Sequence, residues 1–137
     1  MLVLTMHSCQ VPCMGSVDAT YQKIKENLQQ LGQKYVDLLL IHFPGRGDRE
    51  KPSAMGCKGP CKNSSDIQNT WRALSRAQEE GLTRAIGVSN FKPEHIAWIL
   101  ELGLAAPAVN QCSMHIGPGG YDNHTISYCK EHSESHP

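Results

Sequence analysis

The sequence predicts an α/β fold in which short parallel strands alternate with amphipathic helices. Two observations carry this prediction. Short apolar runs recur along the chain, and each run is followed by a stretch whose apolar residues are spaced by three and four. Strands of parallel βαβ units are covered on both faces, so they appear as continuous apolar runs. With 137 residues, the chain is expected to form one domain, residues 1–137, with a core of its own.

Four strands are predicted. They lie at residues 2–5 (LVLT), 36–41 (VDLLLI), 84–88 (RAIGV) and 108–112 (AVNQC). Each is a short apolar run next to residues that break regular structure. The segment 8–15 is predicted as a loop, because it contains Pro12 and Gly15.

Helical spacing connects these strands. The first helix is expected over residues 17–31, capped by Ser16 and ended by Gly32. Its apolar residues recur at steps of three and four and place Tyr21 on the side that faces the core.

Three more helices follow the same spacing rule. The second has Ile67, Trp71 and Leu74 on its inner face, with Ser64 or Ser65 as its cap. The third begins at Pro93 and stops at Gly103, and a fourth is indicated around residues 126–129.

Composition argues against several classes of function. Thirteen basic and thirteen acidic residues give no net charge, so the basic surface of a nucleic-acid-binding protein is not expected. No apolar run approaches the roughly 18 residues that indicate a membrane span. The regular periodicity indicates a core that needs no disulfide framework, so we expect a cytoplasmic protein in a reducing compartment.

Polar residues of chemical use follow three of the predicted strands. His42 ends the second strand, Ser89 and Asn90 end the third, and Asn110 and Gln111 lie in the fourth. The carboxyl ends of parallel strands form one rim, where active sites of α/β folds lie. A histidine can donate to a carbonyl oxygen, and a hydroxyl with two amides can hold a neutral amide. The alternative is that each residue only satisfies a loop or caps a helix.

Three segments resemble the aldo-keto reductases. They are LGQKYVDLLLIHFP, WRALSRAQEEGLTRAIGVSNF and PAVNQCSMH, in the family's order. The resemblance covers residues 2–130 and leaves 131–137 as a polar tail. It implies a (β/α)8 barrel that uses NADPH to reduce aldehydes and ketones to alcohols.

The resemblance also implies roles for single residues. His42 matches the active-site histidine that orients the substrate carbonyl. Ser89, Asn90 and Gln111 match the residues that hydrogen-bond the nicotinamide carboxamide. Phe43 stands where the family often has a tryptophan in the wall of the substrate pocket.

The chain departs from the family in what it lacks. Placed on the family, it runs from about strand 3 to helix 6, whereas a closed barrel takes about 250 residues. The catalytic tyrosine and aspartate fall outside the chain, and Met6 or His7 stands where the catalytic lysine is expected. We therefore expect a partial barrel of about four βα units that is inactive alone. The alternative is a non-catalytic remnant or interaction protein that self-associates through open sheet edges.

The cysteines allow one further reading. Cys9 and Cys13 share their spacing with Cys57 and Cys61, and four thiolates so spaced could bind zinc. Free thiols are the expectation, with a zinc site or disulfides as the alternatives, and no metal-ligating residue is assigned.

Overall fold

Strands and helices alternate along the chain in the computed structural model, which describes residues 7–45, 61–112 and 123–133. The strands are β1 (Ser8–Val11), β2 (Val36–Ile41), β3 (Thr83–Ser89) and β4 (Asn110–Gln111). The helices are α1 (Val17–Leu31), α2 (Ser64–Glu79), α3 (Pro93–Leu100) and α4 (Asn123–Ser133). The strands form one parallel sheet in the order β1-β2-β3-β4, which confirms the α/β class.

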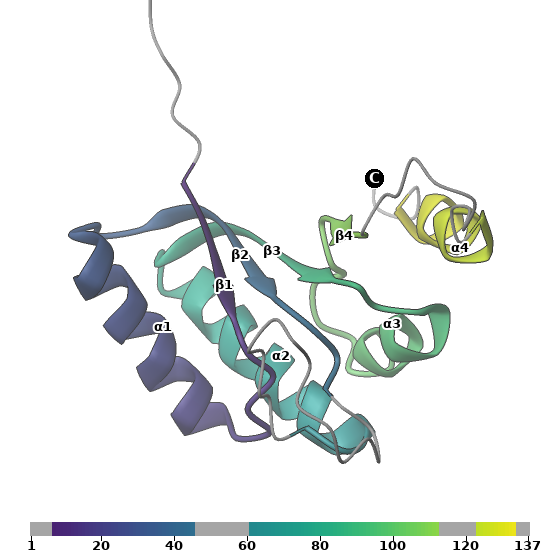
Figure 1. Ribbon diagram of the computed structural model, residues 1–137, viewed down its shortest axis with the longest axis horizontal. Helices are drawn as coiled ribbons and strands as arrows, with labels where there is room; N and C mark the ends of the chain where they lie inside the picture. The colour runs from purple at the N-terminus through teal and green to yellow at the C-terminus, as the bar shows by residue number, and fades with distance from the viewer. Residues whose placement is uncertain (1–6, 46–60, 113–122, 134–137) are drawn as a thin grey trace, which may run out of the picture.

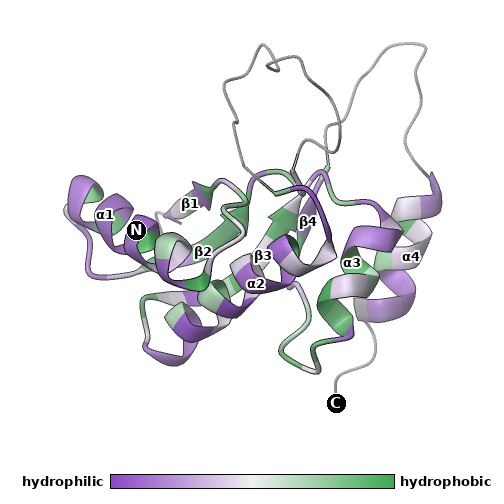
Figure 2. Ribbon diagram, turned by 90° about the horizontal axis from the view of Figure 1, so that it is seen from below, coloured by the Kyte–Doolittle hydropathy of each residue, from purple (hydrophilic) through white to green (hydrophobic). Residues whose placement is uncertain are grey.

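The helices α1 and α2 cover one face of this sheet, and β4 and α4 lie at the far side of the molecule from α1 (Figure 1). Side chains alternate between the two faces, as strand geometry requires. On β2, Leu39 and Ile41 join the core under the helices, whereas Leu38 and Leu40 line a cavity on the other face. Hydrophobic residues gather on β2 and β3, and hydrophilic ones along the outer side of α1 (Figure 2).

The expected helix caps are found, with one correction. Ser16 Oγ accepts from the Ala19 amide at 3.3 Å, and Gly32 ends α1 with a φ of 64°, a left-handed conformation that favours glycine. Helix α2 is capped by Asn63, whose Oδ1 accepts from Asp66 N at 3.0 Å. The prediction of a Ser64 or Ser65 cap was wrong by one or two residues, because both serines are already helical.

The first strand differs from the prediction. The expected strand at residues 2–5 lies outside the described residues, and β1 occupies the segment predicted as a loop, where Ser8 pairs with Leu38 and Val11 with Ile41. Polar Ser8 and Gln10 alternate with Cys9 and Val11 here, which is a period-two strand pattern that ends at Pro12. At the other edge, β4 is shorter than the predicted 108–112.

The core lies between the sheet and the helices. Trp71 and Leu74 of α2 are fully buried against Ile41 and Val88 of the sheet side. Among the described helices, none combines the length and the apolarity needed to cross a membrane.

Candidate functional site

The carboxyl ends of β2, β3 and β4 meet at one rim, as predicted. His42 directly follows β2, and its backbone N–H donates to Val11 O at 2.9 Å, which fixes it beside the end of β1. Asn90 follows β3, and its backbone N–H donates to Gln111 O at 3.0 Å. The structure therefore brings the predicted residues of three strands together.

Asn90 connects the strand ends through both its backbone and its side chain. Its φ of 60° is the one left-handed value of a non-glycine residue in the described part of the chain, and asparagine tolerates that conformation better than most residues. Its Nδ2 donates to Ser89 Oγ at 2.9 Å and to His42 O at 3.4 Å. The bend at Asn90 thus holds the ends of β2 and β3 together.

Ser89 is buried and has its hydroxyl proton in use. Its Oγ donates to Gln111 O at 2.9 Å and accepts from Asn90, and the residue is 3% exposed. In this arrangement Ser89 fixes β4 to β3 and offers a ligand no proton. A direct contact of this hydroxyl with a carboxamide would require it to release Gln111.

The Gln111 side chain reaches across the open face of the sheet. Its Oε1 accepts from Gln10 Nε2 of β1 at 3.0 Å, although β1 and β4 are the two outer strands of the described sheet. This bond crosses a cavity of about 710 Å³. The cavity is lined by Ser8, Gln10, Leu38, Leu40, Val109 and Gln111.

Gly87 of β3 allows Leu40 and Val109 to come together over it and form the floor of this cavity. A Cβ at Gly87 would lie 2.7 Å from Val109 O and 2.8 Å from Leu40 Cδ2. These contacts are closer than van der Waals packing allows. Glycine is therefore required where β3 passes between Leu40 and β4.

Phe43, the aromatic residue beside the histidine, packs against the imidazole ring of His42. Phe43 is half-buried, and its ring centroid lies 4.8 Å from that of His42, with the rings tilted by 53°. This is a usual aromatic contact distance. It fixes the direction of both rings at the mouth of the rim.

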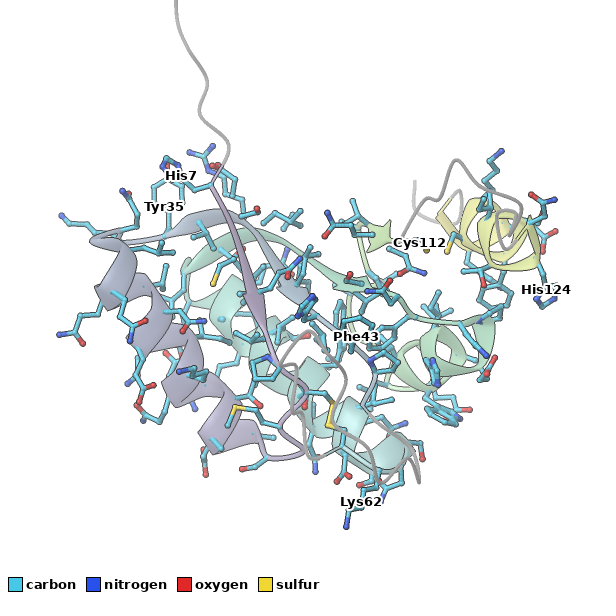
Figure 3. All side chains as sticks on the ribbon, in the orientation of Figure 1. His7, Tyr35, Phe43, Lys62, Cys112 and His124 are labelled. Carbon is cyan, nitrogen blue, oxygen red and sulfur yellow. A yellow bond between two sulfur atoms is a disulfide. The ribbon has the colours of Figure 1, made fainter. Side chains whose placement is uncertain are left out.

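The place expected for the catalytic lysine requires a correction. His7 precedes β1 at the opposite end from the rim, beside Asp37, where its N–H donates to Asp37 Oδ2 at 3.1 Å; Figure 3 shows it near Tyr35 and away from Phe43. Met6 lies outside the described residues. The last inward-facing residue of β1 is Gln10, which cannot supply a positive charge.

One residue of the site was missed at the sequence level, and another, Asn110, was named at the rim but has a structural role. Gln10 was assigned to a loop, although its alternation with Cys9 and Val11 was a strand signal. Asn110 faces the helices: its Nδ2 donates to Phe91 O at 2.8 Å, and its Oδ1 accepts from Phe91 N at 3.3 Å. Nothing in the local sequence pattern distinguishes an asparagine that makes these two hydrogen bonds to the backbone from one that binds a ligand at the rim.

The cysteines differ from the expectation of free thiols. Cys13 and Cys61 form a disulfide (yellow bond in Figure 3) that joins the segment after β1 to the start of α2. Both are 1% exposed. The pair removes two thiolates from the suggested zinc site, whose Cys57 lies outside the described residues. Among the residues described, no group of three His, Cys, Asp or Glu is placed to hold a metal.

Tyr21 packs between α1 and α2, away from the rim, as its spacing predicted. It is 7% exposed, and its hydroxyl donates to the Glu80 carboxylate. That hydrogen bond, with burial second, raises the pKa of Tyr21 above its usual range. A phenol held in this way is a structural link between helices and cannot serve as the proton donor at the rim.

Comparisons with known proteins agree with this geometry. The model of the aldo/keto reductase family matches residues 14–133. Aldo-keto reductase family 1 member A1 of Xenopus tropicalis is 35% identical over 113 residues, which are 80% of this chain and 33% of that protein. Protein REDOX 2 of Catharanthus roseus is 34% identical over 114 residues, which are 83% of this chain and 34% of that protein. The chain spans about a third of the length of these curated relatives.

Solved structures share the fold. The aldo-keto reductase of Brucella melitensis is 28% identical with a TM-score of 0.73, over 93% of this chain and 43% of that one. A Bombyx mori aldo-keto reductase in complex with NADP has a TM-score of 0.73 at 24% identity, over 93% of this chain and 38% of that one. The neighbours are (β/α)8 barrels, so the expected partial barrel is confirmed.

Proposed function

Because the chain belongs to the aldo/keto reductase family, we propose that it supplies the histidine and the carboxamide-binding rim of an NADPH-dependent carbonyl reductase. The observation that carries this proposal is the meeting of His42, Ser89, Asn90 and Gln111 at one end of the sheet. Residues far apart in the sequence converge there through hydrogen bonds between strand ends.

In the proposed reaction, NADPH supplies a hydride to the carbonyl carbon of an aldehyde or ketone. His42 donates a hydrogen bond to the carbonyl oxygen and orients it, and Phe43 forms part of the pocket wall. Polar donors directed at a developing alkoxide lower the barrier because charge accumulates there in the transition state. Protonation of that oxygen requires an acid that the family resemblance assigns to a tyrosine outside this chain.

The residues present fit one end of the cofactor. The exposed Gln111 amide faces the cavity and suits the neutral carboxamide of nicotinamide. Among the described residues that line the cavity there is no lysine or arginine, so none of them offers the phosphates of NADPH an opposite charge. The proposal therefore predicts weak binding of NADPH through its nicotinamide end.

The chain alone is proposed to reduce no carbonyl compound. Gln10 ends the inward-facing side of β1 where a lysine is expected, and Tyr21 is bound to Glu80 on the helix side. The test is NADPH oxidation, followed at its absorbance, with a panel of aldehydes and ketones. We expect no turnover above buffer. Turnover that is lost in His42→Ala would overturn the proposed inactivity.

The reductase assignment has its own test, which reads the coding sequence on both sides of this chain. An in-frame Asp-x-x-x-Tyr segment upstream and a basic phosphate-binding segment downstream would support it. If both segments are missing, the reductase proposal for the whole gene product fails. The cytoplasmic location stays a prediction, and the Cys13–Cys61 disulfide is unusual for that compartment.

A second candidate is a non-catalytic interaction protein. Within the described sheet, β1 and β4 each pair on one side only, and an unpaired strand edge favours pairing with another chain. Two copies could then associate edge to edge. Sedimentation of the purified chain tests this: a dimer that Gln10→Pro dissociates supports the candidate, because proline removes an edge N–H, and a monomer at all concentrations excludes it.

A further inference from the structure

We propose that Gln10 is a specificity-determining residue of the site, and that it forms with Gln111 a subsite that selects a primary carboxamide over a carboxylate. This inference rests on the proposed nicotinamide-binding role of the rim. It adds a residue from β1, on the opposite edge of the sheet, and it states which chemical group that residue recognises.

The side-chain amides of Gln10 and Gln111 use only part of their hydrogen-bonding capacity on each other. Gln10 Nε2 donates to Gln111 Oε1 at 3.0 Å. Among the described residues, neither Gln10 Oε1 nor Gln111 Nε2 has a hydrogen-bond partner. A primary amide carries one carbonyl acceptor and two N–H donors, so the pair presents one open acceptor and an open donor group.

The open donor and acceptor of this pair are complementary to a third primary amide. The carbonyl oxygen of a ligand carboxamide can accept from Gln111 Nε2, while its NH₂ group can donate to Gln10 Oε1. Each of the three amides then donates and accepts one bond in a closed ring. A carboxylate has no proton for Gln10 Oε1, and two facing acceptors repel each other, so the same arrangement rejects an acid.

The residues around the Gln10–Gln111 pair are mostly apolar. The other lining residues among those described are Ser8, Leu38, Leu40 and Val109. In this part of the chain the cavity of about 710 Å³ has an apolar floor and no charged side chain. Leu40 and Val109 close over Gly87, which has no side chain to keep them apart, and together form this floor. Apolar walls with a few directed polar groups are typical of small-molecule sites, and the lack of charge favours a neutral aromatic amide.

The test uses the 137-residue chain labelled with ¹⁵N and two ligands of the same shape, nicotinamide and nicotinate. The side-chain NH₂ signals of Gln10 and Gln111 are identified by their loss in Gln10→Met and Gln111→Met. We expect nicotinamide to shift both signals and nicotinate to shift neither. The affinity for nicotinamide should fall about tenfold in Gln10→Met, through loss of one direct bond and of the support for Gln111.

The matched control is Gln30→Met, which changes the same side chain on the exposed surface of α1 and should leave the affinity unchanged. NADPH binding, followed by its fluorescence, separates the two proposals. If NADPH binds equally well to the wild-type chain and to Gln10→Met, the subsite is refuted and the proposed function stands. If nicotinamide shifts both signals but NADPH does not bind, the subsite stands and cofactor binding by this chain fails. Equal responses to nicotinamide and nicotinate, or none to either, refute the subsite.

Discussion

Two regions of the molecule are packed in different ways. The first region, residues 7–45 and 61–89, has a long β2–β3 pairing that runs from Val36 opposite Thr83 to Ile41 opposite Val88. The second region, residues 90–112 and 123–133, is joined to the sheet through the two residues of β4. It encloses a cavity of about 210 Å³ between α3, β4 and α4, and Val109 and Ile126 are 40% and 37% exposed.

The rim of the site spans both regions. His42 and Ser89 end strands of the first region, whereas Gln111 belongs to the second and is held by bonds to its backbone oxygen. Local stability within a protein follows the density of buried contacts. The geometry of the rim is therefore expected to fail first at Gln111, with the histidine still in place.

The largest expected effect comes from the tryptophan at the centre of the first region. Trp71 is 0% exposed, and its Nε1 donates to Ala105 O at 3.1 Å. Trp71→Ala should lower the free energy of unfolding by about 3–5 kcal/mol, as other large-to-small core substitutions do. Urea unfolding followed by circular dichroism measures this loss.

The matched variant is Trp98→Ala in α3, where the tryptophan is half-buried. It belongs to the second region and should cost less than half as much. Equal losses for the two tryptophans would show that the second region is packed as tightly as the first.

The disulfide gives the next largest effect, again within the first region. Cys13 and Cys61 are 48 residues apart, and a cross-link over a loop of that length restricts the unfolded chain. Cys13→Ala with Cys61→Ala should lower the free energy of unfolding by about 2–4 kcal/mol. Dithiothreitol should destabilise the wild-type chain and leave the double variant unchanged.

Cys112→Ser is the control, because Cys112 is exposed and belongs to the second region. Its stability should stay within about 0.5 kcal/mol of the wild type. If thiol titration of the unfolded, unreduced wild type finds every cysteine free, the disulfide is absent, and the first region owes its stability to packing alone.

A smaller effect is expected in the second region, at the double hydrogen bond of Asn110. Asn110→Ala removes both bonds to the Phe91 backbone and should cost about 1–2 kcal/mol. Asn110→Asp should cost at least as much, because it keeps the acceptor for Phe91 N but sets a carboxylate oxygen against Phe91 O. Amide hydrogen exchange is the measurement, and we expect faster exchange at Phe91 and Asn90 with β2 still protected.

Asn69→Ala serves as the control for Asn110, since Asn69 donates to Gly15 O at 3.2 Å in the first region. It should leave exchange at Phe91 unchanged. Uniformly faster exchange in β2 on Asn110→Ala would mean that the two regions unfold together.

The same contrast explains what the sequence could predict. Strand β2 was predicted at its observed bounds, because apart from Asp37 near its start it appears as one apolar run. Strand β1 was missed because Pro12 suggested a loop, and its identity depends on pairing with β2. Register and pairing are properties of two strands, and a single segment does not contain them.

The site residues also divide into those that one segment predicts and those that depend on how the strands pair. The position of His42 at the rim could be predicted, since it directly follows a clear strand. The bond between Gln10 and Gln111 could not, because it joins residues 101 positions apart and depends on how strongly the sheet curls. The pairing of Cys13 with Cys61 was likewise set by the fold, whereas the shared spacing of the two cysteine pairs had suggested four zinc ligands as an alternative to free thiols.

The smallest expected effect is a pH dependence at the start of α3, in the second region. Burial, the largest cause, lowers the pKa of His95 below its usual value near 6.5, and the positive charge of Lys92 acts in the same direction against the opposing carboxylate of Glu94. Neutral His95 accepts from Lys92 N through Nδ1 at 3.2 Å. A histidine whose pKa is lower in the folded state stabilises the fold fully above the unfolded pKa. That stabilisation is lost as the pH falls through 6.5 toward the lower folded value, because the unfolded chain takes up the proton first.

His95→Gln keeps an acceptor at the third helical position and removes the titration, so its stability should fall less than that of the wild type between pH 7 and pH 5. His124→Gln, on exposed α4 surface, should follow the wild-type curve. Melting temperatures across this pH range measure the effect. Identical curves for His95→Gln and the wild type would mean that neutral His95 does not stabilise α3. The low stability expected of the second region would then come from its short strand β4.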